Sequence, residues 1–291
     1  MSPGEGTPPS GLLLVDKPAG ITSHDAVDRV RRALSTRKVG HAGTLDPMAT
    51  GLLLVGVGRT TRLLRFLADL PKSYLATGLL GIETETLDAE GRATRERDVN
   101  VSERELRAAL AEFTGDILQV PPAYSAVKVG GRRSYDAARR GEPVASPPRP
   151  VRVFAFDLLL FHAPSFDVAV ECSSGTYVRT LVADVGARLG CGAHVTALRR
   201  TAIGPFEVDR ARPPEDPGQL LPVERAAEHL PGVALQTEEA RAARSGAILG
   251  PAGFGGPYRV LGPDGSLIGI YRDDGAKAVP EVILASAPGG S

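Results

Sequence analysis

The sequence predicts an α/β (α+β) fold with a mixed, largely antiparallel sheet flanked by helices, followed by a small β-rich domain. Three features predict it: short apolar strands alternate irregularly with helices, several neighbouring strands are joined by short turns, and a Pro- and acid-rich segment follows Phe206. The chain of 291 residues is long enough for one sizeable domain and an appendix. We expect a disordered start over residues 1–10, a main domain over 11–233 and a small domain over 234–291.

Apolar runs and capping residues place the elements of the first half. Three apolar runs predict strands, over residues 12–15, 51–57 and 73–80. Helices are predicted over residues 23–34, 60–70 and 103–113. Two of these helices begin with a capping-box pattern, Thr22 with Asp25 and Ser102 with Glu105, in which a carboxylate follows a hydroxyl at a spacing of three.

The second half adds a hairpin, a helix and the small domain. Residues 151–161 and 166–172 are rich in Val and Phe and predict a strand pair, and residues 177–189 predict a helix that ends before a glycine. The Pro- and acid-rich segment 210–232 predicts a domain junction. Beyond it, two apolar runs separated by Gly-Pro-Asp-Gly at 262–265 predict a hairpin, with strands over 258–261 and 267–271.

Composition argues against a membrane protein and against a metal centre. No apolar run approaches the roughly 20 residues needed to span a bilayer, and the Pro- and Gly-rich start lacks a signal peptide's apolar stretch, so we expect a cytoplasmic protein. Cys172 and Cys191 are too few for a disulfide framework, and the five histidines show no ligand spacing. We therefore expect no metal. P-loop and dinucleotide fingerprints are absent, which disfavours NTP or NAD chemistry.

Charge is balanced overall and uneven along the chain. Lys plus Arg and Asp plus Glu each number 34, so bulk charge indicates no nucleic-acid partner. Residues 119–150 are locally basic, at 6 − 2 = +4, and form a candidate phosphate-binding insertion; the bases are Lys128, Arg132, Arg133, Arg139, Arg140 and Arg149. Residues 83–116 hold ten acids against five arginines and predict a solvated surface that faces away from a nucleic acid.

The segment GHAGTLDPMATGLLLVG, residues 40–56, is the strongest candidate for chemistry. It ends a predicted loop over 35–47 and sets polar side chains in a Gly-rich turn directly before an apolar strand, where functional groups are often exposed. Pro47 stiffens the residue after Asp46, so this carboxylate is expected to be held in place. The alternative, from the residues alone, is that Asp46 caps a turn and His41 forms a hydrogen bond within the loop.

This segment resembles the signature loop of the TruB family of pseudouridine synthases, and further blocks follow in the family's order. KPAGITSHDAV at 17–27 is similar to its first motif, KSYLATGLLGIETETLDAEG at 72–91 to its tyrosine motif, and QVPPAYSAVKVGGRRSYDAAR at 119–139 to its RNA-gripping insertion. SSGTYVRTL at 173–181 and LRRTAIGPF at 198–206 complete the resemblance. The family implies a pseudouridine-synthase fold with a PUA-like C-terminal domain, although GPAGFGG at 250–256 departs from its pattern and Met48 stands where leucine is usual.

The resemblance also implies roles for single residues. Asp46 is the expected catalytic aspartate, Tyr74 stacks on the target base, and Arg179 pairs with the aspartate and opposes the effect of burial on its ionisation. The substrate-binding residues that the family implies are His41, Tyr177, Leu198, Lys17, Lys128 and Arg132. Taken alone, Arg179 would more often be a surface helix residue, and Tyr74, Tyr177 and Leu198 would more often be core.

The implied reaction is isomerisation of uridine 55 in the TΨC loop of tRNA, by base flipping, cleavage of the C1′–N1 bond, rotation of the uracil and rejoining through C5. It requires no cofactor, and we expect a monomer whose partner is the tRNA T-arm and loop. Asp46 either attacks C1′ or assists removal of the C2′ proton, and the sequence leaves both open.

Two other functions compete with the isomerase. One is a tRNA-folding chaperone that acts without modification, and the same basic insertion would serve it. The other is a nucleoside hydrolase, which normally needs an activated water and often a metal cluster.

Overall fold

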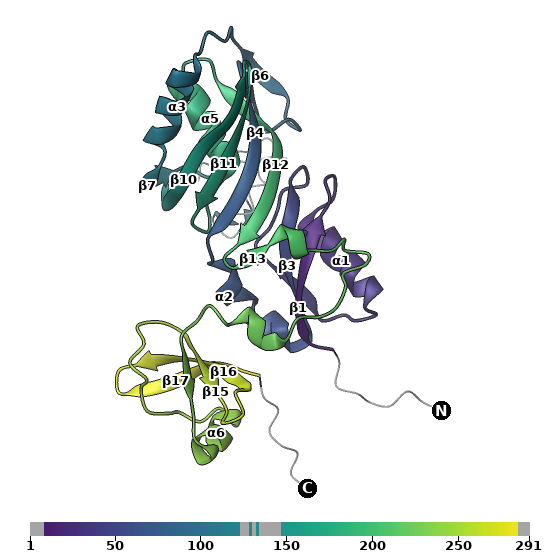
Figure 1. Cartoon of the computed structure of the whole chain (residues 1–291), viewed down its shortest axis with the longest axis vertical. Helices are drawn as coiled ribbons and strands as arrows, with labels where there is room; N and C mark the ends of the chain where they lie inside the picture. Colours follow the sequence, from purple (N-terminus) through teal and green to yellow (C-terminus); the bar gives the residue numbers. More distant parts are fainter. Residues whose placement is uncertain (1–8, 123–127, 130–131, 134–146, 285–291) are drawn as a thin grey trace.

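The computed structural model describes residues 9–122, 128–129, 132–133 and 147–284. Its main body is a nine-stranded sheet in the order β1-β3-β12-β4-β11-β10-β7, with β2 beside β3 and β13 beside β12 (Figure 1). The strands are β1 (Gly11–Lys17), β2 (Val39–Ala42), β3 (Thr50–Val57), β4 (Lys72–Leu80), β7 (Gly115–Gln119), β10 (Arg149–His162), β11 (Ser165–Cys172), β12 (Ala193–Ile203) and β13 (Phe206–Glu207). All neighbouring pairs are antiparallel except β3 with β12, which confirms the predicted mixed, largely antiparallel sheet.

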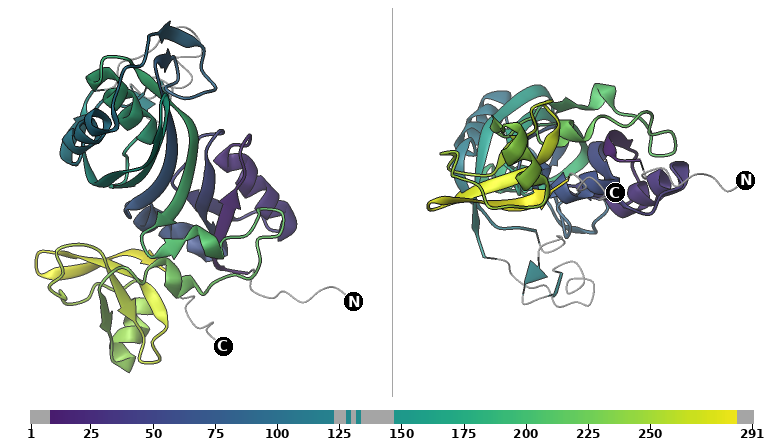
Figure 2. Two further views of the ribbon diagram at one scale, coloured as in Figure 1. Left: turned by 45° about the horizontal axis from the view of Figure 1, so that its top comes forward. Right: turned by 90° about the horizontal axis from the view of Figure 1, so that it is seen from below.

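The sheet has two halves that meet between β3 and β12. The shorter half consists of β1, β2 and β3, and the longer half of β12, β4, β11, β10 and β7. On the shorter half, α1 (Ser23–Ala33) covers β1 and β3, and its apolar stripe of Ala26, Val27 and Val30 is buried as predicted. On the longer half, α3 (Glu103–Glu112) and α5 (Val178–Arg188) pack on one face of β4, β11 and β10 (Figures 1 and 2). Both predicted capping boxes are confirmed, at the starts of α1 and α3.

The two halves meet where β3 runs parallel to β12. The contact is short: Arg199 pairs with Thr50 and Arg200 with Gly51. Gly51 has φ of 104°, and a Cβ atom there would lie 2.2 Å from the carbonyl oxygen of Arg200. Only glycine fits this position, because any side chain would collide with the backbone of β12.

Several elements differ from the sequence-based expectation. The predicted loop 35–47 contains the short strand β2, which depends on pairing with β3. β7 and the eleven-residue β12 were not predicted, because both mix charged or polar residues with apolar ones. The predicted helix 60–70 is a 3₁₀ turn, η1 (Gly58–Leu63), followed by the short α2 (Leu64–Ala68).

The C-terminal module is a separate sheet that docks on the shorter half. Its strands are β14 (Gly232–Ala234), β15 (Tyr258–Leu261), β16 (Leu267–Asp274) and β17 (Lys277–Ile283), beside α6 (Thr237–Arg244). β15 and β16 form the predicted antiparallel hairpin. Apolar side chains of the module share a core with β1, β3 and α2. Three arginines of η1 and α2 reach the end of the chain's last strand: Arg59 contacts Leu284, Arg62 contacts Ile283 and Arg65 pairs with Glu281.

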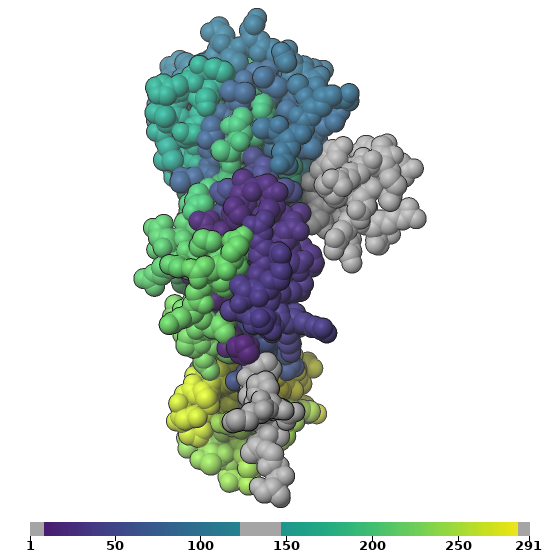
Figure 3. Space-filling model, turned by 90° about the vertical axis from the view of Figure 1, so that its right-hand side faces the viewer, coloured from purple at the N-terminus to yellow at the C-terminus, as the bar shows by residue number. Residues whose placement is uncertain are grey.

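The predicted junction is fastened to the body. It begins at the last residue of the 3₁₀ turn η2 (Val208–Arg210) and contains the 3₁₀ turn η3 (Val223–Ala226), and its backbone bonds to β1 at two points. Leu12 and Leu221 exchange two hydrogen bonds, of 2.8 and 3.0 Å, and the N–H of Asp16 donates to the carbonyl of Arg212 at 2.9 Å. Figure 3 shows this green segment lying against the purple N-terminal part of the chain. The outer edge of β1 is therefore covered, which removes an edge open to pairing with another chain.

The chain ends add two observations. Residues 1–8 of the predicted disordered start lie outside the described residues, whereas the hydroxyl of Ser10 accepts a hydrogen bond from the N–H of Arg59 at 3.1 Å. In the described ranges, no helix combines the length and apolar character needed to cross a membrane.

The cap of α3 gives a test of the fold that leaves the rest of the molecule untouched. Ser102→Ala removes the hydroxyl that accepts from the N–H of Glu105, and should lower the free energy of unfolding by about 1 kcal/mol. Urea denaturation measures the change. Ser102→Asn, which restores a good capping oxygen, should recover most of the loss. Equal stability of the alanine variant and the parent would contradict a stabilising cap.

Candidate active site

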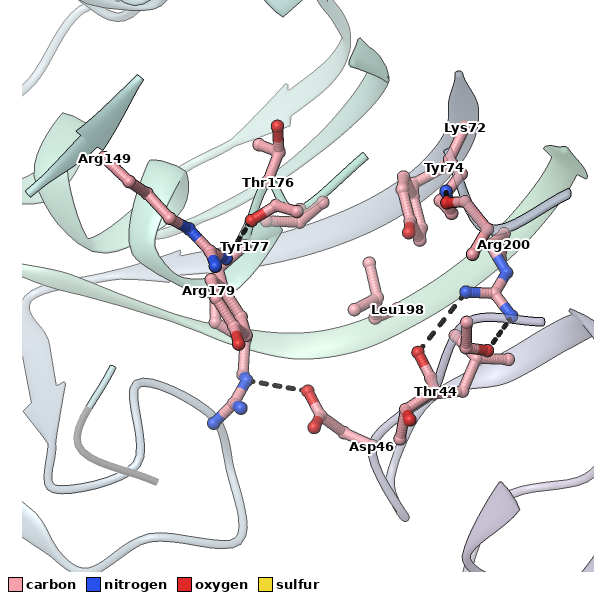
Figure 4. Close-up of a pocket in the computed structure, with 15 residues that line it drawn as sticks. Thr44, Asp46, Lys72, Tyr74, Arg149, Thr176, Tyr177, Arg179, Leu198 and Arg200 are labelled. Carbon is pink, nitrogen blue, oxygen red and sulfur yellow. Dashed lines mark hydrogen bonds and ion pairs between the residues drawn. The ribbon is translucent and has the colours of Figure 1, made fainter. Parts of the chain in front are cut away.

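A pocket of about 340 Å³ opens where the two halves of the sheet meet. Its walls come from the loop 43–46 before β3, from β4, from the start of α5 and from β12. Figure 4 shows Asp46 and Arg179 facing each other on one side, Tyr74 with Arg200 on the other, and Leu198 between them. The structure thus brings together the three predicted catalytic residues, although they come from distant parts of the chain.

Side chains from three elements hold the loop that carries Asp46. The Ser23 hydroxyl at the start of α1 accepts from the N–H of Leu45 at 2.8 Å and lies 3.1 Å from its carbonyl oxygen. Arg200 donates to the carbonyls of Gly43, at 3.1 Å, and Thr44, at 3.4 Å. Because these bonds fix the backbone on both sides of residue 44, the direction of the Asp46 side chain is set before any ligand arrives.

Lys17 takes part in this support and does not line the pocket. Its ammonium is fully buried and donates to the carbonyls of Pro18, Ile21 and Pro47, at 2.9, 2.8 and 3.2 Å. These three bonds use all three donors, so the predicted substrate contact is corrected to a support of the loop end at Pro47. Burial lowers the pKa of Lys17 to about 8.

Arg179 joins two carboxylates in the buried wall of the pocket. Its Nε lies 2.9 Å from Oδ2 of Asp46, and its Nη1 lies 2.9 Å from Oδ2 of Asp88. The side chains of Arg179 and Asp88 are 4% and 5% exposed, whereas that of Asp46 is 34% exposed. Of the two carboxylates, therefore, only that of Asp46 is exposed to the pocket. Arg179 is a buried residue, which excludes the surface-helix alternative.

Asp88 was not predicted as a site residue. It lies in the turn between β5 (Ile82–Thr84) and β6 (Ala93–Glu96), inside the acidic stretch 83–116 that we expected to be wholly solvated. That expectation is wrong at Asp88, because the carboxylate is buried against Arg179. The only sequence signal for a role of Asp88 was its place within the tyrosine motif. Its pairing with Arg179 could not be predicted, because it depends on the packing of the β5–β6 turn against α5.

Burial and a neighbouring carboxylate act together on the ionisation of Asp46. Burial raises the pKa of Asp46, the Arg179 guanidinium opposes this effect, and the neighbouring Asp88 carboxylate adds to the rise. Because burial is the largest of these effects, and because Arg179 is shared with the Asp88 carboxylate, the pKa of Asp46 stays above its ordinary value.

Two further cations, Lys72 and Arg200, line the opposite wall and were not predicted. Arg200 is 1% exposed, and its Nε donates to the carbonyl of Leu52 at 2.7 Å. Lys72 donates to the carbonyls of Ala68 and Leu70, both at 2.8 Å, and burial lowers its pKa to about 8. Both charges are solvated by backbone carbonyls, so they need no carboxylate partner.

The aromatic groups of the pocket are held from behind. Tyr74 is buried on β4, and burial raises the pKa of its hydroxyl. The side-chain amide of Gln119, at the end of β7, accepts from the N–H of Tyr177 at 2.8 Å and donates to its carbonyl at 3.1 Å. The guanidinium of Arg149 lies 4.9 Å from the centre of the Tyr177 ring, a cation–π contact. Gln119 and Arg149 thereby hold Tyr177, the N-cap residue of α5, in place.

Of the remaining predicted residues, His41 lies away from the pocket, and the side chains of the basic insertion are not among the described residues. His41 sits on β2 opposite Val55, does not line the pocket, and has its pKa lowered mainly by burial and secondly by the charge of Arg200. Lys128 and Arg132 belong to the ribbon of β8 (Lys128–Val129) and β9 (Arg132–Arg133), of which only the backbone is described. Arg139 and Arg140 lie outside the described residues. In the described part, no cluster of His, Cys, Asp or Glu is arranged to hold a metal ion.

Asp88→Asn tests the electrostatics of the buried wall. The substitution removes a negative charge that raises the pKa of Asp46, so the pKa of the Asp46 carboxyl should fall. Carbon-13 NMR titration of labelled aspartate measures it. The control is Glu85→Gln, which neutralises an exposed carboxylate paired with Arg92 and should leave the Asp46 titration unchanged. A pKa that rises or stays constant in Asp88→Asn would contradict this description.

Curated relatives match almost the whole chain. A protein of Mycobacteroides abscessus named "tRNA pseudouridine synthase B" is 45% identical over 289 residues, which cover 96% of this chain and 97% of that protein. Proteins of the same name from Mycolicibacterium paratuberculosis and Nocardia farcinica are each 46% identical, over 96% and 95% of this chain and 99% and 94% of their own lengths.

A solved structure shares the fold. A chain of the archaeal box H/ACA sRNP Nop10-Cbf5 complex superposes with a TM-score of 0.74 at 26% identity, covering 96% of this chain and 87% of its own. Three family models match in succession: TruB family pseudouridylate synthase (N terminal domain) over residues 31–178, tRNA pseudouridylate synthase B C-terminal domain over 179–215, and tRNA Pseudouridine synthase II, C terminal, over 230–285. With the near-complete relatives and the observed pocket, these matches show that the chain belongs to the TruB family of pseudouridylate synthases.

Proposed function

We propose that this protein is a tRNA pseudouridine synthase that isomerises uridine 55 of the TΨC loop. The observation that carries the proposal is the partly exposed Asp46 carboxylate, held by buried Arg179 at the edge of a pocket that also contains Tyr74. The names of the near-complete relatives supply the substrate class, tRNA, and the family supplies the reaction.

The pocket suits a nucleotide that has left its stack. A uridine inside a folded loop must be extruded before both its glycosidic bond and its C5 atom can be reached. The ring of Tyr74 and the side chain of Leu198 offer flat and apolar surfaces that replace the lost stacking. Arg149 and Tyr177 stand at the other wall, where a cation favours the adjoining phosphate.

Asp46 is the proposed catalytic group. The reaction breaks the C1′–N1 bond and forms a C1′–C5 bond, while the proton on C5 is lost and N1 gains one, so product and substrate have the same atoms. An ionised Asp46 can attack C1′ or remove the C2′ proton, and either role fails when the carboxylate is protonated. Because burial raises the pKa of Asp46, the rate should rise with pH through a value above that of an exposed aspartate.

Arg179, Asp88 and Arg200 are proposed as positioning groups. Arg179 orients the carboxylate, Asp88 orients Arg179, and Arg200 fixes the loop carbonyls on the other side of Asp46. Each acts through Asp46 or its loop, so their loss should lower the rate more than the binding of tRNA.

We further propose the organisation and setting of the enzyme. The catalytic domain is proposed to span residues 11–233 and a PUA-like domain residues 234–291; the two separate sheets support the division, and β14, which begins at Gly232, moves the boundary to residue 231. The active unit is proposed to be a monomer. Its partner is the T-arm and loop of tRNA, and a tRNA substrate supports action in the cytoplasm.

Asp46→Asn tests the assignment. The variant should lose activity by at least on the order of 10²–10⁴-fold, because an amide is neither a nucleophile nor a base for this reaction, and should still bind tRNA. Tritium release from 5-³H-uridine tRNA measures turnover, and filter binding measures affinity. The matched control is Asp116→Asn, whose side chain is 78% exposed and remote from the pocket.

Retained turnover by Asp46→Asn would reject the catalytic role. Mapping of pseudouridine by chemical labelling and primer extension on wild-type product locates the target, and a signal outside the T-loop would reject position 55. Assistance of tRNA folding by the inactive Asp46→Asn would establish chaperone activity as a separate function of the same RNA-binding surface.

A further inference from the structure

A second cavity, of about 380 Å³, lies at the C-terminal end of α1, away from the pocket around Asp46. It is lined by Arg31, Arg32, Ser35, Thr36 and Arg37, and Lys38 follows directly. We call this set, residues 31–38, the α1 cleft. It contains four cations, two hydroxyl groups and no acid, which is the composition of an anion site.

Capping of the helix does not require these cations. The N–H of Thr36 bonds to the carbonyl of Arg31 at 3.1 Å, and the N–H of Ser35 bonds to that of Arg32 at 3.2 Å. This is the Schellman arrangement, in which the backbone itself satisfies the last carbonyls. Arg31 and Arg32 gain some energy from the helix dipole, but Arg37 and Lys38 lie beyond the helix end, where that effect fades.

The charge of the α1 cleft is poorly neutralised. Arg31 pairs with Asp28 at 2.8 Å, and the Nε of Arg32 donates to the carbonyl of Asp28 at 3.3 Å. Within the described ranges, Arg37 and Lys38 form no ion pair and are exposed. Glu215, which pairs with Arg29, also lies within electrostatic reach of Arg32, so four cations face two acids and leave a surplus of 4 − 2 = +2 next to an open cavity. An anion could bind there without displacing an existing partner.

The position of the cleft favours RNA as the source of the anion. β2 begins at Val39, directly after the cleft, and ends at Ala42, directly before the Asp46 loop. The eight residue steps from Lys38 to Asp46 span at most roughly 29 Å, which is shorter than one turn of a nucleic-acid duplex, roughly 34 Å. An RNA with one nucleotide in the pocket can therefore reach the cleft with its own backbone. Figure 3 shows this N-terminal part of the surface, in purple to indigo, open to solvent above the C-terminal module.

We propose that the α1 cleft binds a backbone phosphate of the tRNA at a distance from the uridine that enters the pocket. The inference rests on the proposed function. Arg37 in the cavity lining and the exposed Lys38 beside it supply the free charge, Arg32 adds a guanidinium suited to phosphate, and the hydroxyls of Ser35 and Thr36 can donate to its oxygens. Because such contacts carry no sequence information, the cleft sets the position of the RNA and leaves the choice of base to the pocket.

The test uses the full-length double variant Arg37→Gln/Lys38→Gln. Each phosphate contact contributes about 0.7–0.9 to the slope of log K against log salt concentration, so loss of the one proposed contact should reduce the magnitude of the slope by about 0.7–0.9. Filter binding of unmodified tRNA across a salt series measures the slope. KM for tRNA should rise, while kcat at saturating tRNA stays constant, because neither residue touches the pocket.

The matched control is Arg95→Gln/Arg104→Gln, which makes the same change of net charge. Arg95 lies on β6 and Arg104 in the first turn of α3, and both are exposed. The control should leave the slope unchanged. An unchanged slope in the cleft variant would overturn the proposal, as would an equal fall in the control, which would indicate a bulk-charge effect. A fall in kcat with unchanged binding would also overturn it, because it would show a disturbance passed along β2.

The salt slope does not depend on turnover, so the two proposals fail separately. If the wild-type protein makes no pseudouridine but the cleft variant alone loses slope, the isomerase assignment fails and the phosphate site stands. If the wild-type protein is active and the slopes are equal, the cleft proposal fails and the isomerase assignment stands.

Discussion

The buried guanidinium of Arg179 is the interaction on which the architecture of the site depends. It binds Asp46 from the loop before β3 and Asp88 from the turn between β5 and β6, while its own backbone belongs to α5. Loss of one member of a buried charge network leaves the others unpaired, at a cost of about 3–5 kcal/mol. Three segments separated in sequence are therefore locked to one another, and the pocket is the space they enclose.

The charge network of Arg179, Asp46 and Asp88 has two buried members and one that is partly exposed. Arg179 and Asp88 are buried, whereas the Asp46 carboxylate is partly exposed at the pocket, so the Asp46 side chain is oriented by groups that are already in place before a substrate binds. Lys17, Ser23 and Arg200 do the same for the backbone of the loop. Polar groups fixed in advance need no reorganisation when charge develops in the reaction, which is the main way that such sites stabilise a transition state.

Local patterns in the sequence predicted the apolar strands, the capped helices and the hairpins, because those signals lie within a few neighbouring residues. β12 escaped prediction, since Arg199 and Arg200 interrupt its apolar pattern and find Asp16 and the loop carbonyls only after folding. The same limit hid Asp88. The roles of Asp46, Tyr74 and Arg179 came from family motifs, and Lys17 shows where motif membership overstates contact with a ligand: the residue belongs to the first motif, yet its three donors are already used.

The narrow joint between β3 and β12 has a consequence for how the protein can vary. Apolar side chains that lie far from the joint, such as those that α1 buries against β1 and those that α3 buries against β10, share no contacts and can be exchanged independently. At the joint itself no side chain can be added at position 51, because Gly51 touches the backbone of Arg200. One additional carbon there would act as a wedge that forces β3 and β12 apart. Since Asp46 belongs to one half and Tyr74 to the other, a wedge of that size would widen the gap in which the uracil must turn.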